Sequence, residues 1–284
     1  MPLMIVGTVP YENFPLTYSG CSFKDGRLNL GRESIPVLRG TPALLAAACI
    51  ASEVLGLEKP RALVAGDIGL GDGSRQVYAH IVKYLPECNE QIIVFHYLQP
   101  DVDWHNRILI KIEELDRRPI LVADAGYMYV AKMSGFAASY DLFTPDVGEM
   151  AFLADESAPH PFYTRGFLLQ EDDGVPELIR RAYEHENAAR YLLVKGKTDI
   201  VASVNGIVAD ISEPCVENME PIGGTGDSLT GIVAALICCG RSVPESAALG
   251  AKTNRIVGHV ANPTPAWSIA DLLSCLPQAL RDVL

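Results

Sequence analysis

Short apolar runs alternate with longer amphipathic segments along most of this chain. The apolar runs predict strands over residues 4–7, 62–65, 91–95, 120–123, 138–143 and 191–194. The longer segments predict helices over residues 41–55, 74–85, 105–115, 148–153, 175–186, 227–239, 244–260 and 269–284. Strands that alternate with helices build a mainly parallel sheet, because each crossover carries a helix onto one of its faces. We therefore expect an α/β fold with helices on both faces of a central sheet.

The segment 198–208 interrupts this alternation. Its apolar runs flank Asn205-Gly206, and Asn-Gly is the residue pair that most favours a two-residue hairpin turn. We expect an antiparallel hairpin at the edge of the sheet, whose free edge leaves self-association into a homo-oligomer open. Residues 155–173 contain prolines, a glycine and an acidic run, and they predict a surface insertion or flap. The rest of residues 1–284 fits a single domain.

The charge balance limits the classes of ligand. A net charge of −12 argues against a nucleic-acid-binding protein, because there is no basic excess to displace counterions from phosphates. No apolar run approaches the length of a membrane span, and residues 1–7 lack the basic region of a signal peptide. We therefore expect a cytoplasmic protein with no nucleic-acid or membrane partner. An anionic small molecule would need local hydrogen-bond donors.

A glycine-rich loop, residues 223–231, provides such donors. Its glycines allow a sharp turn with inward-pointing N–H groups, and the helix that follows adds unpaired donors and a positive dipole end. Asp227 lies where the loop enters the helix, so its carboxylate can take a proton from a substrate hydroxyl beside a bound phosphate. The alternative is a simple turn followed by a helix N-cap, since Asp and Ser are favoured caps.

The loop is the last of a series of motifs in the second half of the chain. They are Asp124-Ala125, TPDVGE at residues 144–149, KGKT at residues 195–198 and GTGD at residues 224–227. Their order resembles the ribokinase-like superfamily, and within it the carbohydrate-kinase branch that includes NAD(P)H-hydrate dehydratase. The resemblance runs from about residue 119 to the C-terminus. It implies a ribokinase-like three-layer sandwich with a mainly parallel central sheet, helices on both faces and an edge β-hairpin.

The resemblance also implies the chemistry of the glycine loop. Asp227 would act as the catalytic base or proton relay. The backbone amides of Gly224, Thr225 and Gly226 would form the anion hole for the transferred phosphate. The phosphoryl donor would be ATP or ADP.

A magnesium site is implied at the TPDVGE turn. In the family the glutamate of this turn helps to organise Mg²⁺ and water, so Glu149 would inherit that role, with Asp146 beside it. A divalent ion that bridges nucleotide phosphates suits an acidic protein without a P-loop. The alternative for Glu149 is an acid in the first turn of a helix, stabilised by the helix dipole.

Nucleotide contacts are implied for a further group of residues. Lys195-Gly196 follows a strand, and the resemblance places it, with Thr198, close to the nucleotide phosphates. A surface lysine before a turn is the alternative. The nucleotide base is expected between the loop after the hairpin and the helix that contains Asn254, which makes Asn254 a candidate contact.

Substrate contacts are expected at the ends of strands, because open α/β sheets bind ligands at their carboxyl edge. Asp124 ends such a strand, and a cap or turn role is its alternative. A second glycine cluster, residues 66–74, is either a substrate loop in which Asp67 contacts a polyol hydroxyl or a plain connection. Gly40 belongs to the stretch nearest to the family's sugar-binding element. His96 faces the same cleft or, as the favoured interpretation, is a structural histidine.

Two segments depart from the dehydratases. Residues 95–101, FHYLQPD, stand where those enzymes carry a GPG loop, and Asp146-Val147 replaces a His-Pro pair. We therefore expect an ATP- and Mg²⁺-dependent small-molecule kinase of the carbohydrate type, with Asp227 as the base for a substrate alcohol. The alternative is an ATP- or ADP-dependent NAD(P)H-hydrate dehydratase, which phosphorylates the hydrate at the same site and then loses phosphate. A non-catalytic nucleotide-binding sensor is a second alternative, although it would need neither Asp227 nor Glu149.

Overall fold

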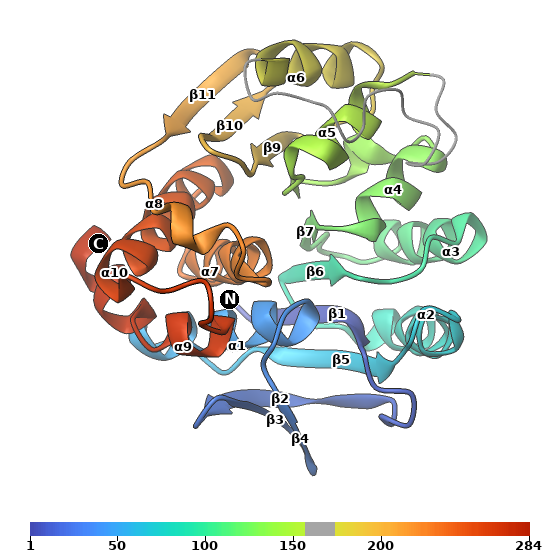
Figure 1. Ribbon diagram of the computed structural model, residues 1–284. Helices are drawn as coiled ribbons and strands as arrows, with labels where there is room; N and C mark the ends of the chain where they lie inside the picture. Colours follow the sequence, from blue (N-terminus) through green and yellow to red (C-terminus); the bar gives the residue numbers. More distant parts are fainter. Residues whose placement is uncertain (157–173) are drawn as a thin grey trace.

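The computed structural model describes residues 1–156 and 174–284. In this part of the chain, eleven strands form a sheet in the order β11-β10-β9-β8-β7-β6-β1-β5-β2-β3-β4 (Figure 1). The parallel strands are β9 (Tyr191–Val194), β8 (Leu142–Phe143), β7 (Ile120–Ala123), β6 (Ile92–His96), β1 (Leu3–Val9) and β5 (Arg61–Gly66). Each coincides with a predicted apolar run, although β8 occupies only the end of the predicted strand 138–143.

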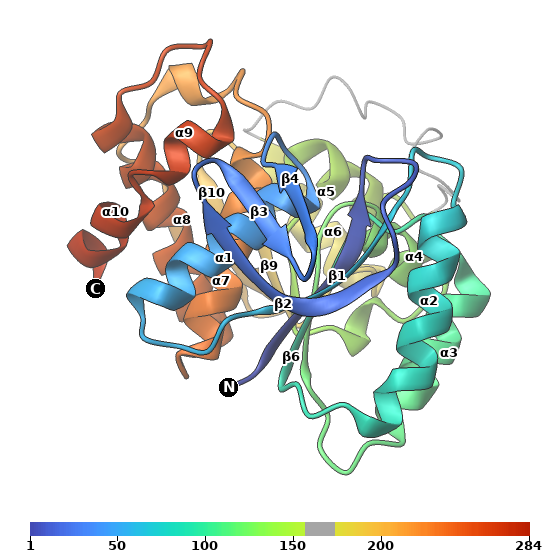
Figure 2. The same ribbon diagram turned by 90° about the horizontal axis from the view of Figure 1, so that it is seen from below.

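Antiparallel strands extend the sheet at both ends. The predicted hairpin is formed by β10 (Asp199–Ser203) and β11 (Gly206–Ile211), and β11 is an edge strand. At the other end, β2 (Thr17–Lys24), β3 (Arg27–Leu30) and β4 (Glu33–Pro36) continue the sheet beyond β5 (Figure 2). The apolar pattern missed these three strands. Most of their side chains are only partly buried, so no apolar run marks them.

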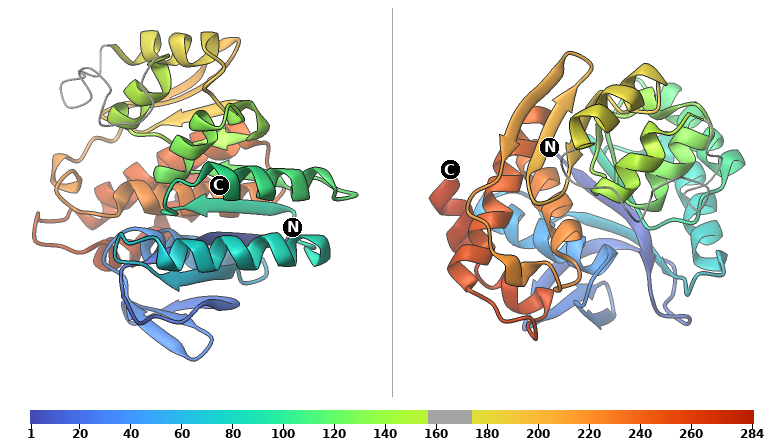
Figure 3. Two further views of the ribbon diagram at one scale, coloured as in Figure 1. Left: turned by 90° about the vertical axis from the view of Figure 1, so that its right-hand side faces the viewer. Right: turned by 45° about the horizontal axis from the view of Figure 1, so that its top comes forward.

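Helices cover both faces of the sheet (Figure 3). One layer contains α1 (Thr41–Val54), α7 (Thr225–Cys238), α8 (Val243–Ala261), α9 (Ile269–Leu273) and α10 (Leu276–Val283). The other contains α2 (Asp72–Tyr84), α3 (Val102–Glu113), α4 (Gly126–Met133), α5 (Val147–Ala154) and α6 (Val175–Glu184). Alternate side chains of β1 enter the two cores, Leu3 and Ile5 the first, Met4 and Val6 the second. The predicted three-layer sandwich is confirmed.

Other differences from the predicted elements are local. The predicted helix 269–284 is divided into α9 and α10, with Pro277 in the first turn of the second helix. Helix α4 was not predicted. The predicted flap lies outside the described residues apart from residues 155–156. Across residues 1–156 and 174–284, every helix is too short or too polar to cross a bilayer.

Gly231 lets α7 approach α1 closely. A Cβ at this position would lie 2.2 Å from the carbonyl oxygen of Leu44 and 3.1 Å from Cβ of Ala47. We therefore expect Gly231→Ala to lower the free energy of unfolding by about 1–3 kcal/mol, the usual cost of overpacking a core. Urea unfolding measures the change. Gly20→Ala is the control, since a Cβ there meets nothing within 4 Å, and equal stability of the two variants would contradict the tight packing.

Candidate active site

Asp227, the predicted base, lies with three other polar residues at the carboxyl edge of the parallel strands. His96 ends β6, Asp124 follows β7, Lys195 follows β9, and Asp227 lies in the first turn of α7. The Nε2 atom of His96 is 3.0 Å from Oδ1 of Asp227 and 3.9 Å from Oδ2 of Asp124. Side chains from separate elements thus form one polar cluster, at the edge where open α/β sheets bind ligands.

The glycine-rich loop at residues 223–231, called the phosphate loop below, has the geometry expected of an anion site. Gly224 has a φ of 99°, in the left-handed region that favours glycine, and it is the N-cap of α7. The helix starts at Thr225, slightly earlier than predicted, so Gly226 and Asp227 both belong to its first turn. The first N–H groups of a helix have no partner within the helix, and they carry the positive end of its dipole. The loop can therefore receive a phosphate group beside Asp227.

The Asp227 carboxylate is held at both oxygens. Oδ2 accepts the backbone N–H of Gly40 at 2.7 Å, and Oδ1 pairs with Nε2 of His96. Its side chain keeps 15% exposure, so it is not closed off from solvent. Burial tends to raise the pKa of Asp227, but the hydrogen bond and charge of His96, the charge of Lys195 and the Gly40 N–H together lower it. The group is therefore ionised at neutral pH, as a base must be.

Asp124 and Lys195 form a buried ion pair beneath this loop. Lys195 Nζ is 2.8 Å from Oδ1 of Asp124, and the Thr230 hydroxyl donates to Oδ2 at 2.6 Å. Burial favours the neutral amine, but the charges of Asp124 and Glu149 outweigh it and raise the pKa of Lys195. The Asp124 carboxylate also accepts the backbone N–H of Ala125 at 2.8 Å, which matches the turn role expected as its alternative, and its predicted contact with substrate remains a prediction. The carboxylate is buried and positions Lys195.

The same cluster has the donor atoms of a cation site, but Lys195 already supplies a positive charge there. Ligand atoms of His96, Asp124 and Asp227 lie within 4.8 Å of one another. The ammonium group of Lys195 already brings a positive charge to Asp124, and a Cβ placed on Gly226 would lie 3.6 Å from the same Nζ atom. A lysine between an acid and the phosphate loop suits contact with a phosphate oxygen.

Asp146 and Glu149, the predicted magnesium ligands, form a capping box at the start of α5. The Asp146 carboxylate accepts the Glu149 N–H at 2.7 Å, and the Glu149 carboxylate accepts the Asp146 N–H at 2.9 Å. Burial raises the pKa of Glu149; Lys195 opposes this rise, while Asp146 and Asp124 add to it. Crowded carboxylate oxygens are the donors that Mg²⁺ takes in proteins. The capping box matches the alternative expected for Glu149, an acid in the first turn of a helix, and magnesium binding at these carboxylates stays a prediction.

Comparison with known proteins assigns the family. The carbohydrate-kinase family model, described as NAD(P)H-hydrate dehydratase, matches residues 99–278. The chain belongs to this family of enzymes. An uncharacterised protein of Methanocaldococcus jannaschii is 41% identical over 225 residues, which cover 79% of this chain and 92% of that protein. The ADP-dependent (S)-NAD(P)H-hydrate dehydratase of Cenarchaeum symbiosum is 29% identical over 61% of this chain, and the match spans only 55% of that enzyme.

Solved kinases share the fold of this family member. Phosphofructokinase-2 of Escherichia coli, in complex with fructose-6-phosphate, matches with a TM-score of 0.58 at 13% identity over 99% of both chains. The pyridoxal kinase of Staphylococcus aureus, in complex with AMP-PCP and pyridoxal, matches with a TM-score of 0.52 at 11% identity over 89% of this chain and 87% of its own. The predicted superfamily is confirmed. Within it, the family model fits the alternative prediction, a dehydratase, better than the main prediction of a kinase.

The other residues predicted to bind nucleotide lie near the phosphate loop. The Gly196 N–H donates to Asp199 at 3.1 Å, and this bond shapes the turn after Lys195. Asn254 of α8 accepts a hydrogen bond at 3.3 Å from the Ser228 hydroxyl, in the first turn of α7. Thr198 is half-buried immediately before β10. Their contacts with a nucleotide remain predictions.

The remaining substrate residues have clear structural tasks. The Asp67 carboxylate accepts backbone N–H groups of its own loop and both the N–H and hydroxyl of Ser74. It braces the β5–α2 connection, as the alternative of a plain connection requires, and its contact with a polyol remains a prediction. Gly40 donates its N–H to Asp227, so it holds the carboxylate of the predicted base.

His96 is fully buried and bonded at both ring nitrogens, as the favoured interpretation of a structural histidine requires, but its contact with Asp227 was not predicted. The available signal was its position at the carboxyl end of a parallel strand.

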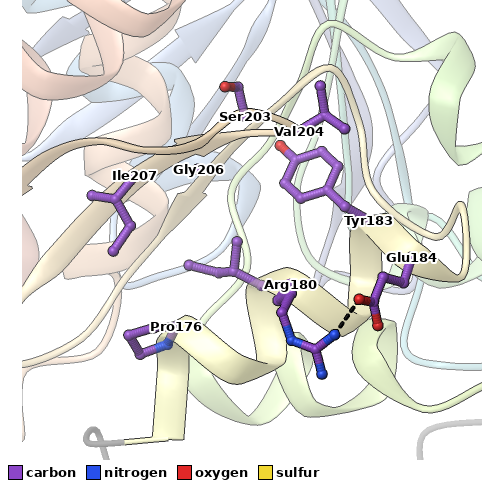
Figure 4. Close-up of a pocket in the computed structure, with 9 residues that line it drawn as sticks. Pro176, Arg180, Tyr183, Glu184, Ser203, Val204, Gly206 and Ile207 are labelled. Atoms are coloured by element: carbon purple, nitrogen blue, oxygen red, sulfur yellow. Dashed lines mark hydrogen bonds and ion pairs between the residues drawn. The ribbon is translucent and has the colours of Figure 1, made fainter.

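A hollow of about 320 Å³ lies elsewhere, between α6 and the hairpin of β10 and β11 (Figure 4). Ser203, at the turn of this hairpin, pairs with Tyr191, the first residue of β9. Lys195 follows the last residue of the same strand. The hollow therefore lies toward the amino end of β9, whereas Lys195 and Asp227 lie at its carboxyl end. It is separate from the candidate active site.

Proposed function

We propose that the protein is a nucleotide-dependent NAD(P)H-hydrate dehydratase. The observation that carries this proposal is the family match over residues 99–278, which includes the Lys195 turn and the Asp227 loop. The dehydratase of Cenarchaeum symbiosum, named as ADP-dependent, supports ADP as well as ATP as the donor. The cluster of Asp227, Lys195 and the phosphate loop supplies the groups that such a reaction needs.

The reaction begins with proton transfer to Asp227. As the hydroxyl of the hydrate loses its proton to this carboxylate, its oxygen forms a bond to the terminal phosphorus of the nucleotide, and the shortened nucleotide leaves. The C–O bond then breaks, inorganic phosphate departs, and loss of a proton from the neighbouring carbon restores the dihydropyridine ring. The net change is removal of water from the hydrate at the expense of one phosphoanhydride bond.

The remaining groups stabilise charge during this transfer. The first N–H groups of α7 would donate to the oxygens of the transferred phosphoryl group, and Lys195 would contact a phosphate oxygen. Glu149 and Asp146 would hold a magnesium ion, which when bound neutralises charge on the nucleotide phosphates.

A second candidate is a kinase for another small-molecule alcohol. The observation that favours it is the segment 95–101, which replaces the GPG loop of the dehydratases and lies beside Asp227 through His96. Loss of phosphate would not follow the transfer in this case, and the phosphorylated alcohol would be the product.

A turnover assay distinguishes the two candidates. Purified protein with Mg²⁺ and either ADP or ATP is given freshly prepared NADH hydrate, or a panel of sugars, nucleosides and vitamin alcohols. Recovery of NADH absorbance in step with nucleotide consumption supports the dehydratase. A stable phosphorylated product from a panel alcohol supports the kinase. Nucleotide binding with no turnover of any compound would support the non-catalytic nucleotide-binding sensor and reject both enzyme candidates.

A further inference from the structure

His96 is a fully buried histidine whose ring is fixed at both nitrogens. Its exposed fraction is 0%. Nε2 lies 3.0 Å from Oδ1 of Asp227, and Nδ1 lies 2.9 Å from the hydroxyl oxygen of Thr41. An ionised carboxylate can only accept, so Nε2 must carry the proton that bonds to Asp227. Thr41 then fixes the plane of the ring from its other side.

The backbone is shaped to allow this arrangement. Gly7 of β1 pairs with His96 in the sheet. A Cβ on Gly7 would lie 2.3 Å from the His96 carbonyl oxygen and 2.8 Å from the Thr41 hydroxyl oxygen. Only the absence of a side chain at Gly7 lets the start of α1 come down onto the end of β6. The contact of Thr41 with His96 is thus built into the core of the fold.

His96 and Gly40 together set the direction of the Asp227 carboxylate. Gly40 holds Oδ2 and His96 holds Oδ1. Each carboxylate oxygen has a further lone pair, which remains for a substrate hydroxyl. Without His96, the carboxylate would keep only the Gly40 bond and could rotate about it.

The charges around Asp227 come from several elements. Lys195 after β9 lowers its pKa, Asp124 after β7 lies 3.9 Å from the His96 ring, and Glu149 of α5 and Tyr97 interact electrostatically with the same cluster. Among these groups, only His96 and Lys195 favour the ionised form of Asp227.

We propose that His96 is a positioning residue, which orients Asp227 toward the acceptor hydroxyl and keeps it ready to take the proton. This inference rests on the proposed function, because it takes Asp227 as the base. It goes beyond the family assignment, since Gly7, Gly40, Thr41 and His96 all precede residue 99, where the family match begins. The inference holds whether the acceptor is a hydrate or another alcohol.

Paired substitutions test the proposal. In His96→Leu, we expect kcat to fall by about 10²-fold, within the range for a general base that loses its support, with the KM for nucleotide nearly unchanged. The acid limb of the pH profile should move to higher pH, because burial then raises the pKa of Asp227 with less opposition. His96→Gln should recover most of the loss, since its amide nitrogen can donate from the place of Nε2.

The matched control is His105, another fully buried histidine, which bonds to Tyr140 at 2.9 Å and to Ser134 at 3.0 Å in the opposite helical layer. His105→Gln should reduce thermal stability and leave the pH profile of turnover in place. If the His96 variants lose activity only in proportion to their stability, with an unshifted pH profile and no rescue by Gln, the proposal is overturned.

A spectroscopic measurement keeps the proposal separate from the proposed function. In protein labelled with ¹⁵N-histidine, NMR should show His96 protonated at Nε2, with a signal that moves in Asp227→Asn and stays in place in Asp210→Asn. If the wild type turns over no acceptor, the proposed function fails while this signal still reports the pairing. A signal insensitive to Asp227→Asn would overturn the positioning role in either case.

Discussion

Replacing Asp227 with Asn is expected to lower kcat by about 10²–10⁴-fold, the usual contribution of a positioned general base. Nucleotide affinity should stay close to that of the wild type. The amide has nearly the size of the carboxylate, but it cannot take the proton of the acceptor hydroxyl. The N–H groups of the phosphate loop belong to the backbone of α7, so they do not depend on the carboxylate. Steady-state turnover and calorimetric nucleotide binding measure the two quantities.

Asp210→Asn is the control for this experiment. Asp210 is exposed on β11, so this substitution removes one negative charge at a place away from the site. It should leave both quantities unchanged. Unchanged turnover in Asp227→Asn would exclude Asp227 as the base. Loss of nucleotide binding with normal turnover at saturation would place the carboxylate beside the nucleotide instead of the acceptor.

The sequence was sufficient for the parallel strands and for the phosphate loop. Strands β1, β5, β6 and β7 are buried on both sides, so each one appears as an apolar run that needs no tertiary information. The phosphate loop is local as well, because glycines before a helix fix both its turn and the direction of its N–H groups. The family resemblance then indicated that the motifs at residues 124–125, 144–149, 195–198 and 224–227 belong to one site.

The partners of Asp227 could not be predicted in this way. His96 is 131 positions away from it and Gly40 is 187 positions away. Their meeting depends on how closely α1 and α7 approach the end of β6, and that distance is set by Gly7 and Gly231 inside the core. A local pattern shows that a loop exists at a strand end; it does not show which loops touch.

The difference between local patterns and contacts between distant segments also explains why the substrate is harder to assign than the chemistry. Lys195, the proposed phosphate contact, and Asp227, the proposed base, lie within the family match at residues 99–278. The residues that hold the base from the acceptor side, Gly40 and His96, lie before it. The fold brings both sets to one edge of the sheet. Specificity is therefore to be sought in the loops that follow β4 and β6.

Replacing Arg255 with Met is expected to lower the free energy of unfolding by about 3–5 kcal/mol, the usual cost of leaving a buried charge without its partner. Arg255 Nε lies 2.8 Å from Oδ2 of Asp199, and the side chains of both are at most 10% exposed. The guanidinium also donates to the carbonyl oxygens of Gly196, Lys197 and Ser212. Urea unfolding at neutral pH measures the loss.

The stability loss of Arg255→Met should shrink as the pH falls. This pH dependence shows whether the unpaired Asp199 causes the loss. Burial already raises the pKa of Asp199 against the opposing charge of Arg255. Without the arginine, the pKa of Asp199 rises further and a protonated Asp199 needs no cation, so acid relieves the variant more than the wild type. Arg180→Met, at an exposed pair with Glu177, should cause a much smaller change with no such pH dependence. Equal losses in both variants would show that the buried pair of Arg255 contributes no more to stability than the exposed pair of Arg180. A large loss together with a raised KM for nucleotide would show that Arg255 also holds the Lys195 turn in place for the phosphates.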